Sequence, residues 1–410
     1  MRVLYINPTF PPDYTGGAEV SIYHAVRGLM QRGIECTLLV VNNRQAADVD
    51  QWYSVDDIPT HRITLRTRLP GQETFDPRIY RIVRRELAAT RPDLVHINNV
   101  SGMSLAPFLA CRHARIPVIV TLHDLWLLCP NNMRYRTDGS FCDPGQFPNG
   151  CHQCFRRYQY WAAVPQRKRI FQQLTANVHT FIAPSQALLE RHVEAGYERQ
   201  RFRMLQYGFA EAIPTEAQDR QVRQIERSAP DYHTLVFAGG GSVNKGPQVV
   251  LDAIPTLIDQ IENLRIIVAG GGEDRFMAQF RRYDPVVQVL SRIDFADMRS
   301  LFANANLTLV ASTWHENSPV VIYENFQVGT PCVGSNFGGI PELITEDKTG
   351  YLFPVGDAQA LAAKVLHHFQ KPAEQRRQMR LACVKVARQR FNFTTYLDRL
   401  CQLYGEVLHG

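Results

Sequence analysis

The chain has 410 residues, of which 45% are hydrophobic, 20% charged and 10% aromatic. At roughly 150 residues per domain this length predicts two or three domains, and the composition excludes collagen, coiled coils and a disordered chain. The net charge of +6 comes from 45 basic and 39 acidic side chains. This small excess favours an anionic ligand or an anionic membrane face, but it does not require nucleic acid as a partner.

No stretch of about 18 consecutive apolar residues occurs, so we expect no membrane-spanning helix. The first residues, Met1 to Asn7, lead straight into a loop and lack the charged and apolar regions of a signal peptide. We therefore expect a cytoplasmic protein. Nine cysteines in such a chain do not form a disulfide framework.

The first half of the chain alternates predicted strands and helices. An apolar run at 3–6 leads into a loop that contains Gly16 and Gly17, and helical spacing of apolar residues follows from Ala18 to Gln31. Gly33 closes that helix, and 36–41 is the second strand. Further strands are expected at 61–65, 94–97, 118–122 and 179–183, and helices at 78–90 and 186–194. This order is typical of a parallel α/β sheet.

A polar stretch at about 212–232 interrupts the pattern and predicts a linker between domains, with a surface helix. A strand at 235–238, the triplet Gly239-Gly240-Gly241 and a helix at 247–260 then repeat the opening order. Further strands are expected at 264–269, 286–290, 307–310, 331–334 and 350–353. The chain is therefore predicted to fold as two α/β domains of similar size.

The two glycine-rich turns, Gly16-Gly17 and Gly239-Gly240-Gly241, each lie between a predicted strand and a predicted helix. Glycines let backbone approach a phosphate closely, and a helix N-terminus supplies N–H donors. Neither turn is an intact dinucleotide fingerprint, so tight turns of a doubly wound sheet remain an equal interpretation. Lys245, just before the second helix, favours an anion at the second turn.

The most specific stretch is HENSPVVIYE, which begins at His315 and ends at Glu324. Ser318 is predicted to cap a helix whose first residue is Pro319. Glu316 then lies in the loop before this helix, and Glu324 lies roughly 8 Å along its axis. A diphosphate at the helix start would have one carboxylate on each side. Carboxylates suit vicinal diols of a sugar or a ribose because they accept two hydrogen bonds.

This stretch resembles the paired-glutamate signature of the retaining glycosyltransferases of family 4, also called group 1. That resemblance implies the GT-B fold, two Rossmann-like doubly wound parallel-sheet domains that face a cleft. The match is extended by the segments at 16–19, 183–185, 329–333, 338–342 and 350–353 and by the segment around His96.

The resemblance implies roles for individual residues. Glu316 would hold the donor sugar and Glu324 the ribose. His123 would contact the donor sugar near the reacting centre, and Lys245 would stabilise the leaving diphosphate. The nucleotide base would be held by the backbone of Arg292 and Ile293. The remaining donor contacts would come from the glycine turns and from the backbone around the helix start: Gly16, Gly17, Gly240, Gly241, Asn317, Ser318, Pro319 and Val320.

One position departs from the family pattern. The family carries an arginine after the glycine of the first strand of its C-terminal domain, where this chain has Gly240. One contact to the diphosphate is therefore lost, which puts the tightness and identity of the donor in question.

The domains implied are an N-terminal acceptor-side domain at 1–210, a C-terminal nucleotide-sugar domain at 211–385, and a helix at 386–410 that returns to the first domain. The expected reaction moves a sugar from a UDP- or GDP-linked donor to a hydroxyl of a glycan, a lipid carrier or a small molecule, with retention and without a catalytic metal. The alternatives are a sugar-nucleotide epimerase, a glycosidase and a non-catalytic sugar-nucleotide-binding protein. The sequence Asp48-Val49-Asp50 could be a metal-binding Asp-x-Asp, but a solvated acidic loop is the favoured interpretation.

An insert at 129–154 contains four cysteines, Cys129, Cys142, Cys151 and Cys154, separated by 12, 8 and 2 residues. Because this loop is rich in turn formers and poor in apolar residues, a structural zinc ion would order it. Buried thiols that cluster by chance, or an iron–sulfur cluster, remain alternatives.

Basic and aromatic residues at 156–169, and arginines at positions 78, 81, 84 and 85, would suit peripheral contact with the inner face of a membrane. A solvated helix face is an equal interpretation.

Overall fold

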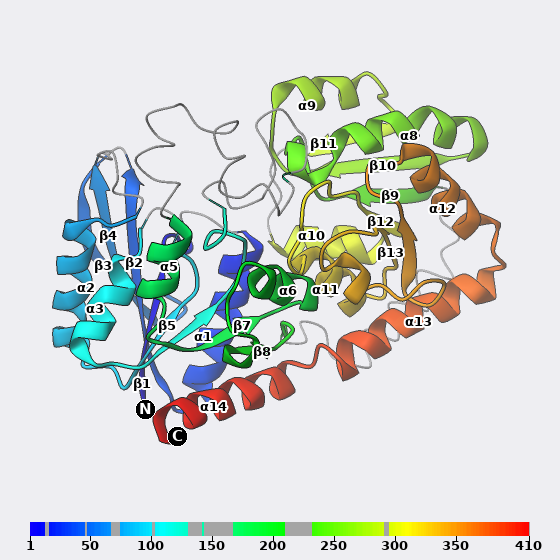
Figure 1. The fold of residues 1–410 in the computed structure, drawn as a ribbon. Helices are drawn as coiled ribbons and strands as arrows, with labels where there is room; N and C mark the ends of the chain where they lie inside the picture. The colour runs from blue at the N-terminus through cyan, green and yellow to red at the C-terminus, as the bar shows by residue number, and fades with distance from the viewer. Residues whose placement is uncertain are drawn as a thin grey trace. The chain divides into compact units, whose positions relative to one another are not determined.

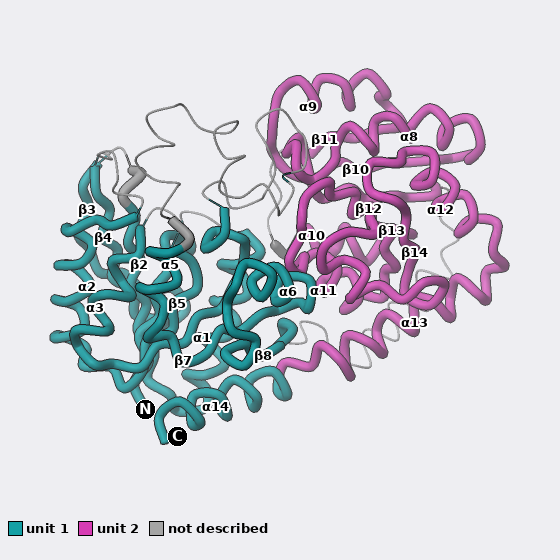
Figure 2. Tube along the Cα trace, viewed as in Figure 1, with its two compact units in different colours: residues 1–208, 394–410 teal, residues 209–393 magenta. Residues whose placement is uncertain are grey.

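The computed structural model describes residues 1–12, 16–45, 47–66, 74–100, 103–129, 142, 167–209, 232–290 and 295–409. The chain divides into two compact units (Figure 2). Unit 1 comprises Met1–Gly208 and Thr394–Gly410, and unit 2 comprises Phe209–Phe393. Each unit is built on its own β-sheet with helices packed against it (Figure 1). Among the described residues, no helix is long and apolar enough to cross a membrane.

The sheet of unit 1 has the strand order β3-β4-β2-β1-β5-β6-β7-β8. Neighbouring strands are parallel except β3 and β4, which form an antiparallel pair at one edge. The strands are β1 (Arg2–Asn7), β2 (Glu35–Gln45), β3 (Val49–Val55), β4 (Ile58–Arg66), β5 (Leu94–Ile97), β6 (Val118–Thr121), β7 (Val178–Ala183) and β8 (Phe202–Met204).

Local sequence explains where the helices of unit 1 begin. The side chain of Asp76 accepts a hydrogen bond from the backbone N–H of Arg78 at 2.9 Å, and that of Ser185 accepts from Leu188 at 3.2 Å, so each residue caps a helix. The helices are α1 (Gly17–Gln31), α2 (Pro77–Thr90), α3 (Ala106–Ala114), α5 (Arg167–Leu174), α6 (Gln186–Glu194), the 3₁₀ turn η3 (Arg199–Arg201) and α14 (Phe393–His409).

The sheet of unit 2 is parallel throughout, in the order β11-β10-β9-β12-β13-β14. Its strands are β9 (His233–Phe237), β10 (Leu264–Ala269), β11 (Val287–Leu290), β12 (Leu307–Val310), β13 (Cys332–Ser335) and β14 (Gly350–Phe353). Its helices are α8 (Pro247–Gln260), α9 (Asp274–Arg281), α10 (Phe295–Ala303), α11 (Val320–Gln327), α12 (Ala358–Gln370) and α13 (Ala373–Gln389), with 3₁₀ turns η4 (Val243–Lys245) and η5 (Ile340–Glu342).

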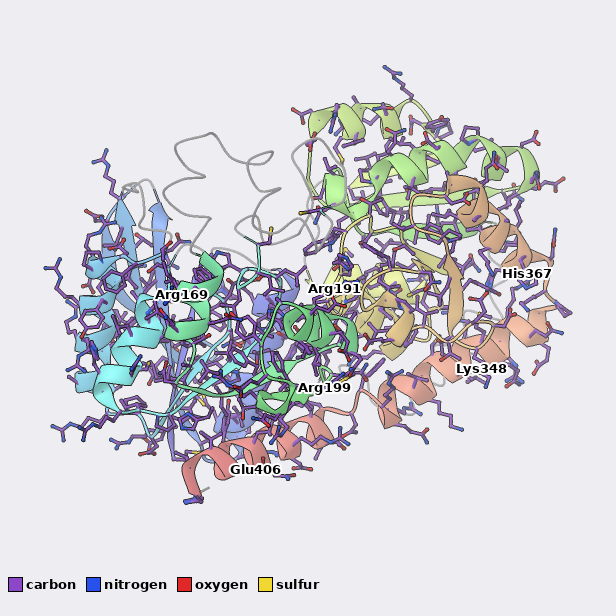
Figure 3. All side chains as sticks on the ribbon, in the orientation of Figure 1. Arg169, Arg191, Arg199, Lys348, His367 and Glu406 are labelled. Carbon is purple, nitrogen blue, oxygen red and sulfur yellow. The ribbon has the colours of Figure 1, made fainter. Side chains whose placement is uncertain are left out.

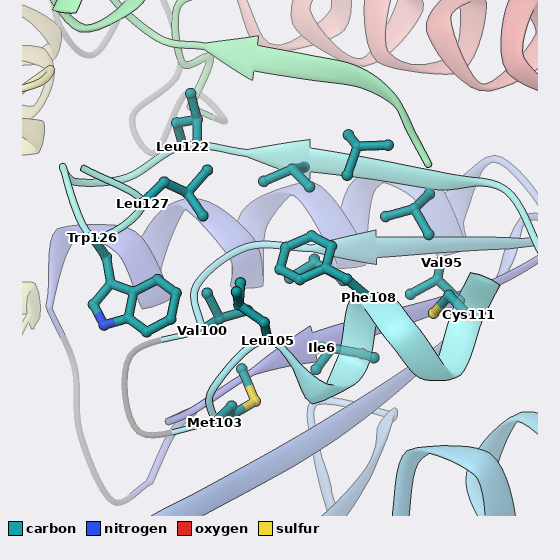
Figure 4. Packing of buried hydrophobic residues seen from close by; sticks show 14 of the residues in the cluster. Ile6, Val95, Val100, Met103, Leu105, Phe108, Cys111, Leu122, Trp126 and Leu127 are labelled. Atoms are coloured by element: carbon teal, nitrogen blue, oxygen red, sulfur yellow. The ribbon is translucent and has the colours of Figure 1, made fainter. Parts of the chain in front are cut away.

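Each unit has its own hydrophobic core. In unit 1, side chains of β1, β5 and β6 pack against α3, where Phe108 is fully buried (Figure 4). In unit 2, side chains of β9, β10 and β12 pack against α8 and α12. Exposed charged side chains such as Arg199, His367 and Glu406 lie on the surface (Figure 3). Two separate cores confirm the prediction of two parallel-sheet α/β domains.

A buried polar chain fastens α14 to unit 1. The Tyr404 hydroxyl lies 2.6 Å from the Tyr5 hydroxyl on β1 and 2.6 Å from Nδ1 of His96 on β5. The other ring nitrogen of His96 lies 2.7 Å from Oγ1 of Thr121 on β6. Burial lowers the pKa of His96 to about 3, so its imidazole is neutral and shares hydrogen bonds without a charge.

Two local predictions were wrong. Asp50 lies within β3, not in a solvated acidic loop, and it bonds His61 Nε2 at 2.8 Å and Arg85 at 2.9 Å. Helix α11 begins at Val320, one residue later than expected, with Pro319 at its cap position. Ser318 is not the cap, because its hydroxyl lies 2.6 Å from the Tyr323 hydroxyl.

Candidate functional site

Lys245 and Glu316 meet within unit 2. Lys245 ends η4, between β9 and α8, and Glu316 lies in the loop that follows β12. Since β9 and β12 are parallel neighbours, their carboxyl ends share one edge of the sheet. There Lys245 Nζ donates to Oε1 of Glu316 at 2.6 Å. The Ser312 hydroxyl donates to the same oxygen at 2.7 Å.

The carboxyl group of Glu316 is held in its ionised form. Its side chain is only 6% exposed. Burial raises the pKa of Glu316, but the charge and hydrogen bond of Lys245 and the hydroxyl of Ser312 outweigh it, and the net pKa lies below the ordinary value. The side chain of Trp314 lowers the pKa of the Glu316 carboxyl further. An ionised carboxylate has two oxygens and can accept hydrogen bonds from hydroxyls of a ligand as well.

Two features around this pair were missed by sequence reasoning. Lys245 Nζ lies 5.6 Å from the ring centroid of Trp314, within range of a cation–π contact. Ser312 was not singled out either. No residue pattern marked these two positions, because their roles depend on the loop path between β12 and α11.

The Gly338-Gly339 pair supports the backbone of Glu316. The Gly339 N–H donates to the Glu316 carbonyl at 2.8 Å. Gly338 has φ +60°, and a Cβ there would lie 2.4 Å from the same carbonyl oxygen. The ring of His315 packs on Phe337 with centroids 4.1 Å apart. Glycine at 338 therefore allows the two loops to meet and fixes where Glu316 sits.

Glu324 lies inside α11 and is half-buried. Burial raises the pKa of its carboxyl to about 7, and the charge of Arg299 on α10 opposes part of that rise. Arg299 was not predicted as a site residue. No sequence pattern marks Arg299, because only the packing of α10 against α11 brings it near Glu324.

The raised pKa of Glu324 predicts a pH-dependent stability. The folded state holds the proton up to about pH 7 but the unfolded state releases it near the ordinary value of 4.5. The bound proton therefore stabilises the folded state fully below pH 4.5. This contribution, at most about 3 kcal/mol, is lost as the pH rises through 7. Urea unfolding at pH 5 and pH 8 should show that, as the pH rises, the wild type loses stability relative to Glu324→Gln, because groups such as His96 and His123 titrate alike in both proteins. An equal pH dependence in both proteins would contradict the assignment.

Gly240 and Gly241 interlock with a second glycine-rich loop at 270–272. Gly241 N–H donates to the Gly271 carbonyl at 3.2 Å, and Glu273 N–H donates to the Gly241 carbonyl at 3.1 Å. Gly240 has φ +53°, and a Cβ there would lie 2.2 Å from the Gly271 carbonyl oxygen. The arginine of the family pattern is thus sterically excluded from position 240 in this backbone.

We expect Gly240→Ala to lower the free energy of unfolding by about 1–3 kcal/mol or more. The loss has two causes, because alanine is strained in this left-handed backbone conformation and its Cβ would collide with the Gly271 carbonyl oxygen. Gly33→Ala is the matched control, since Gly33 has φ +79° with open space around its Cβ position. Urea unfolding should show a larger loss for position 240. Equal losses would contradict the interlocked loops. By the same reasoning, Gly240→Arg should not tighten donor binding.

The predicted site residues of unit 1 are Gly16, Gly17 and His123. Gly16 precedes α1, and its N–H donates to Glu19 at 3.1 Å, while the Thr9 hydroxyl donates to the other oxygen of Glu19 at 2.7 Å. His123 follows β6. Its Nδ1 lies 2.7 Å from the hydroxyl of Tyr207, and its Nε2 lies 3.3 Å from Oδ1 of Asn98. Burial lowers the pKa of His123 to about 3, which makes it a neutral hydrogen-bonding group and not a proton carrier near pH 7.

Several predicted positions lie outside the described residues: Arg292, Ile293, Cys151 and Cys154. Cys129 and Cys142 are described and half-buried. Within the part of the chain that is described, no group of three or more potential metal ligands comes together.

Comparison with known proteins identifies the family. The model of family 4 glycosyltransferases matches residues 15–209, and the model of group 1 glycosyl transferases matches residues 218–388. This chain belongs to the family 4, group 1 glycosyltransferases. The two matches together span most of the glycosyltransferase, which confirms the resemblance found in its motifs.

Curated relatives match parts of this glycosyltransferase. A granule-bound starch synthase 1 of Zea mays is 26% identical over 160 residues, which cover 37% of the chain and 26% of that protein. A phosphatidyl-myo-inositol mannosyltransferase of Mycobacterium leprae is 26% identical over 131 residues, which cover 32% of the chain and 35% of that protein. The chain therefore aligns with only about a quarter to a third of the length of these two relatives.

Solved structures confirm the GT-B fold of the glycosyltransferase. The Anabaena protein HepE, crystallised with UDP and glucose, superposes with a TM-score of 0.72 at 19% identity, over 99% of this chain and 100% of that chain.

Proposed function

We propose that this glycosyltransferase transfers a sugar from a UDP- or GDP-linked donor to a hydroxyl acceptor, with retention of the anomeric configuration. The observation that carries the proposal is the contact between Lys245 and Glu316, which places a cation for phosphate and a buried carboxylate for sugar hydroxyls at one sheet edge. The UDP and glucose bound by HepE support a nucleotide-sugar donor. Starch and phosphatidyl-inositol in the names of the relatives support a glycan or lipid-linked acceptor.

In this mechanism the donor diphosphate lies at the start of α11, near the backbone of Asn317, Ser318, Pro319 and Val320. The N–H groups there and the Lys245 ammonium stabilise negative charge on the leaving diphosphate. The acceptor hydroxyl attacks the anomeric carbon from the face that the diphosphate leaves, and its proton passes to the departing diphosphate as the bond from the sugar to phosphate breaks. Glu316 holds the sugar and Glu324 the ribose by accepting hydroxyl hydrogen bonds. Unit 1 supplies the acceptor side, and its Gly16, Gly17 and His123 are proposed as further contacts to the donor.

A thermal-shift panel of nucleotides and nucleotide-sugars tests the donor. We expect a UDP- or GDP-sugar to raise the melting temperature, and the nucleotide of that donor to raise it as well. An acceptor screen with the best donor and NMR of the product then tests transfer and retention. Inverted product would contradict the retaining mechanism, and release of nucleotide diphosphate without a glycoside would favour an epimerase or hydrolase.

The four-cysteine insert is proposed to hold a structural zinc ion. Elemental analysis of the purified protein should find about one zinc per chain, and Cys151→Ser with Cys154→Ser should remove it, because a tetrahedral site needs all four ligands. The matched control is Cys111→Ser, which replaces a buried core thiol. Metal far below one per chain in the wild type would contradict the zinc site.

A peripheral membrane contact and a cytoplasmic location are also part of the proposal. Arg81, Arg84 and Arg85 of α2 have exposed side chains, which would suit an anionic bilayer surface. Liposome co-sedimentation that does not depend on lipid charge would contradict this contact.

A further inference from the structure

A small pocket lies in unit 1 where strands β5 and β6 end. Its cavity volume is about 20 Å³, which is room for a group the size of one water molecule or hydroxyl. Its polar lining consists of Asn98, Asn99, His123 and Asp124, and apolar side chains complete it. The walls at Val100, Phe108, Leu122, Trp126 and Leu127 are seen in Figure 4.

Two asparagines at this sheet edge have buried amide atoms that lack a hydrogen-bond partner among the described residues. The atoms are Nδ2 of Asn98 and Oδ1 of Asn7. The residue Asn98 is 5% exposed and the residue Asn7 is 0% exposed. Ile6 pairs with Ile97 in adjacent parallel strands, so Asn7 and Asn98 lie side by side at the strand ends. The other amide atom of each is engaged, by the Thr9 carbonyl at 2.5 Å and by His123 at 3.3 Å.

Asn98 lines the pocket, whereas Asn7 lies beside it at the strand end and does not line it. Each unpaired buried polar atom costs about 1–3 kcal/mol, so a ligand with a donor for Asn7 and an acceptor for Asn98 is favoured. A hydroxyl both donates and accepts. An ionised phosphate or carboxylate could accept from Asn98 but could not donate to Asn7.

The charge of the residues that line the pocket also favours a neutral ligand. Asp124 lines it, with Oδ1 bonded to the N–H of Trp126 at 2.7 Å and Oδ2 to Asn99 at 3.1 Å. Among the described residues, no lysine or arginine lines the pocket. An anionic group would therefore meet a carboxylate without a compensating cation.

We infer that this pocket is the acceptor subsite and that it takes a hydroxyl of a neutral polyhydroxyl compound, a sugar or a cyclitol, in preference to a phosphorylated one. The inference rests on the proposed transfer to a hydroxyl acceptor and names its class. Asn98 donates to the acceptor hydroxyl, Asn7 accepts from a hydroxyl at the same edge, and neutral His123 fixes the orientation of the Asn98 amide.

Ligand-observed NMR on the full chain without nucleotide tests the subsite. The neutral probes are methyl α-D-glucopyranoside, methyl α-D-mannopyranoside and myo-inositol, and the anionic probes are glucose 6-phosphate and mannose 6-phosphate. We expect at least one neutral probe to bind at least about tenfold more tightly than either phosphate, the equivalent of one hydrogen bond. Equal or tighter binding of a phosphate, or no binding of any neutral probe, would overturn the inference.

Variants locate the binding. Asn98→Leu and Asn98→Asp each remove the donor, and both should weaken the neutral probe at least about tenfold. Asn177→Leu is the control, since Asn177 also has a buried amide oxygen without a partner among the described residues but does not line the pocket. Melting curves show which variants are folded, and unchanged binding in either folded Asn98 variant overturns the assignment.

The thermal-shift panel of nucleotide-sugars distinguishes a failure of the subsite from a failure of the proposed transfer. A chain that binds the neutral probe but no nucleotide-sugar contradicts the proposed transfer and leaves the polyol subsite supported. A chain that binds a nucleotide-sugar but no neutral probe contradicts the subsite alone.

Discussion

Lys245→Ala and Glu316→Ala should each lower the rate of sugar transfer at least about 100-fold, because each removes a charge that acts on the transition state. The Lys245 variant loses the ammonium that stabilises the leaving diphosphate, and the Glu316 variant loses the carboxylate that holds the donor sugar. Removal of Lys245 also leaves the Glu316 carboxylate buried without its cation, which destabilises the ionised form. The measurement is the initial rate with the best donor found in the thermal-shift panel, on variants whose melting curves show them to be folded.

Lys364→Ala is the matched control. Lys364 forms an ion pair of the same length, 2.6 Å, with Glu346, and its side chain is 35% exposed, close to the 36% of Lys245. It lies on α12 and is not among the proposed site residues. Its transfer rate should stay within about twofold of wild type, as expected for a surface pair. Wild-type rates in both site variants would refute the assignment of Lys245 and Glu316.

Tyr404→Ala should lower the free energy of unfolding of unit 1 by about 4 kcal/mol or more. Loss of a fully buried aromatic side chain costs about 3–5 kcal/mol. Here the change also leaves the Tyr5 hydroxyl and the Nδ1 atom of His96 without the hydroxyl that lies 2.6 Å from each. The measurement is urea unfolding, with signals followed for each unit so that the transition of unit 1 is separated from that of unit 2.

Two variants on the same helix separate the causes. Tyr404→Phe keeps the ring and removes only the hydroxyl, so it should cost about 1–3 kcal/mol. Glu406→Ala changes an exposed residue of α14 and should stay within about 0.5 kcal/mol of wild type. If Tyr404→Ala costs no more than Glu406→Ala, α14 is not held to unit 1 by this contact.

The buried strands were the part of the fold that sequence reasoning predicted best. Strands at 94–97, 307–310 and 350–353 were predicted with the bounds that the structure has. Such strands are apolar on both faces and end at turn formers, so both ends are marked locally. Strand β3 was missed because its half-exposed sequence, VDQWYSV, carries no buried run, and its pairing with β4 places Asp50 against His61.

Sequence reasoning singled out the candidate-site residues that lie in a motif, and it missed the residues that lie outside one. Glu316, Lys245 and Glu324 were singled out by their spacing around a strand end and a helix start. Ser312, Trp314 and Arg299 were not, because each acts on a neighbour in space: Ser312 and Trp314 on the Lys245–Glu316 pair, and Arg299 on Glu324. The cap of α11 was placed one residue early, since the Ser318 hydroxyl bonds the Tyr323 hydroxyl on the first turn of the helix and not a backbone N–H.

The sequence by itself determined that the chain forms two α/β domains and marked the motif that we propose carries its chemistry, since apolar periodicity and residue spacing are local properties. Only the tertiary structure decided the electrostatics of those residues. Glu316 is ionised because Lys245, 71 positions away in the chain, donates to it, whereas Glu324 holds its proton to about pH 7 because its burial outweighs the charge of Arg299. Burial and distance between charges set a pKa, and both depend on packing between elements that are distant along the chain.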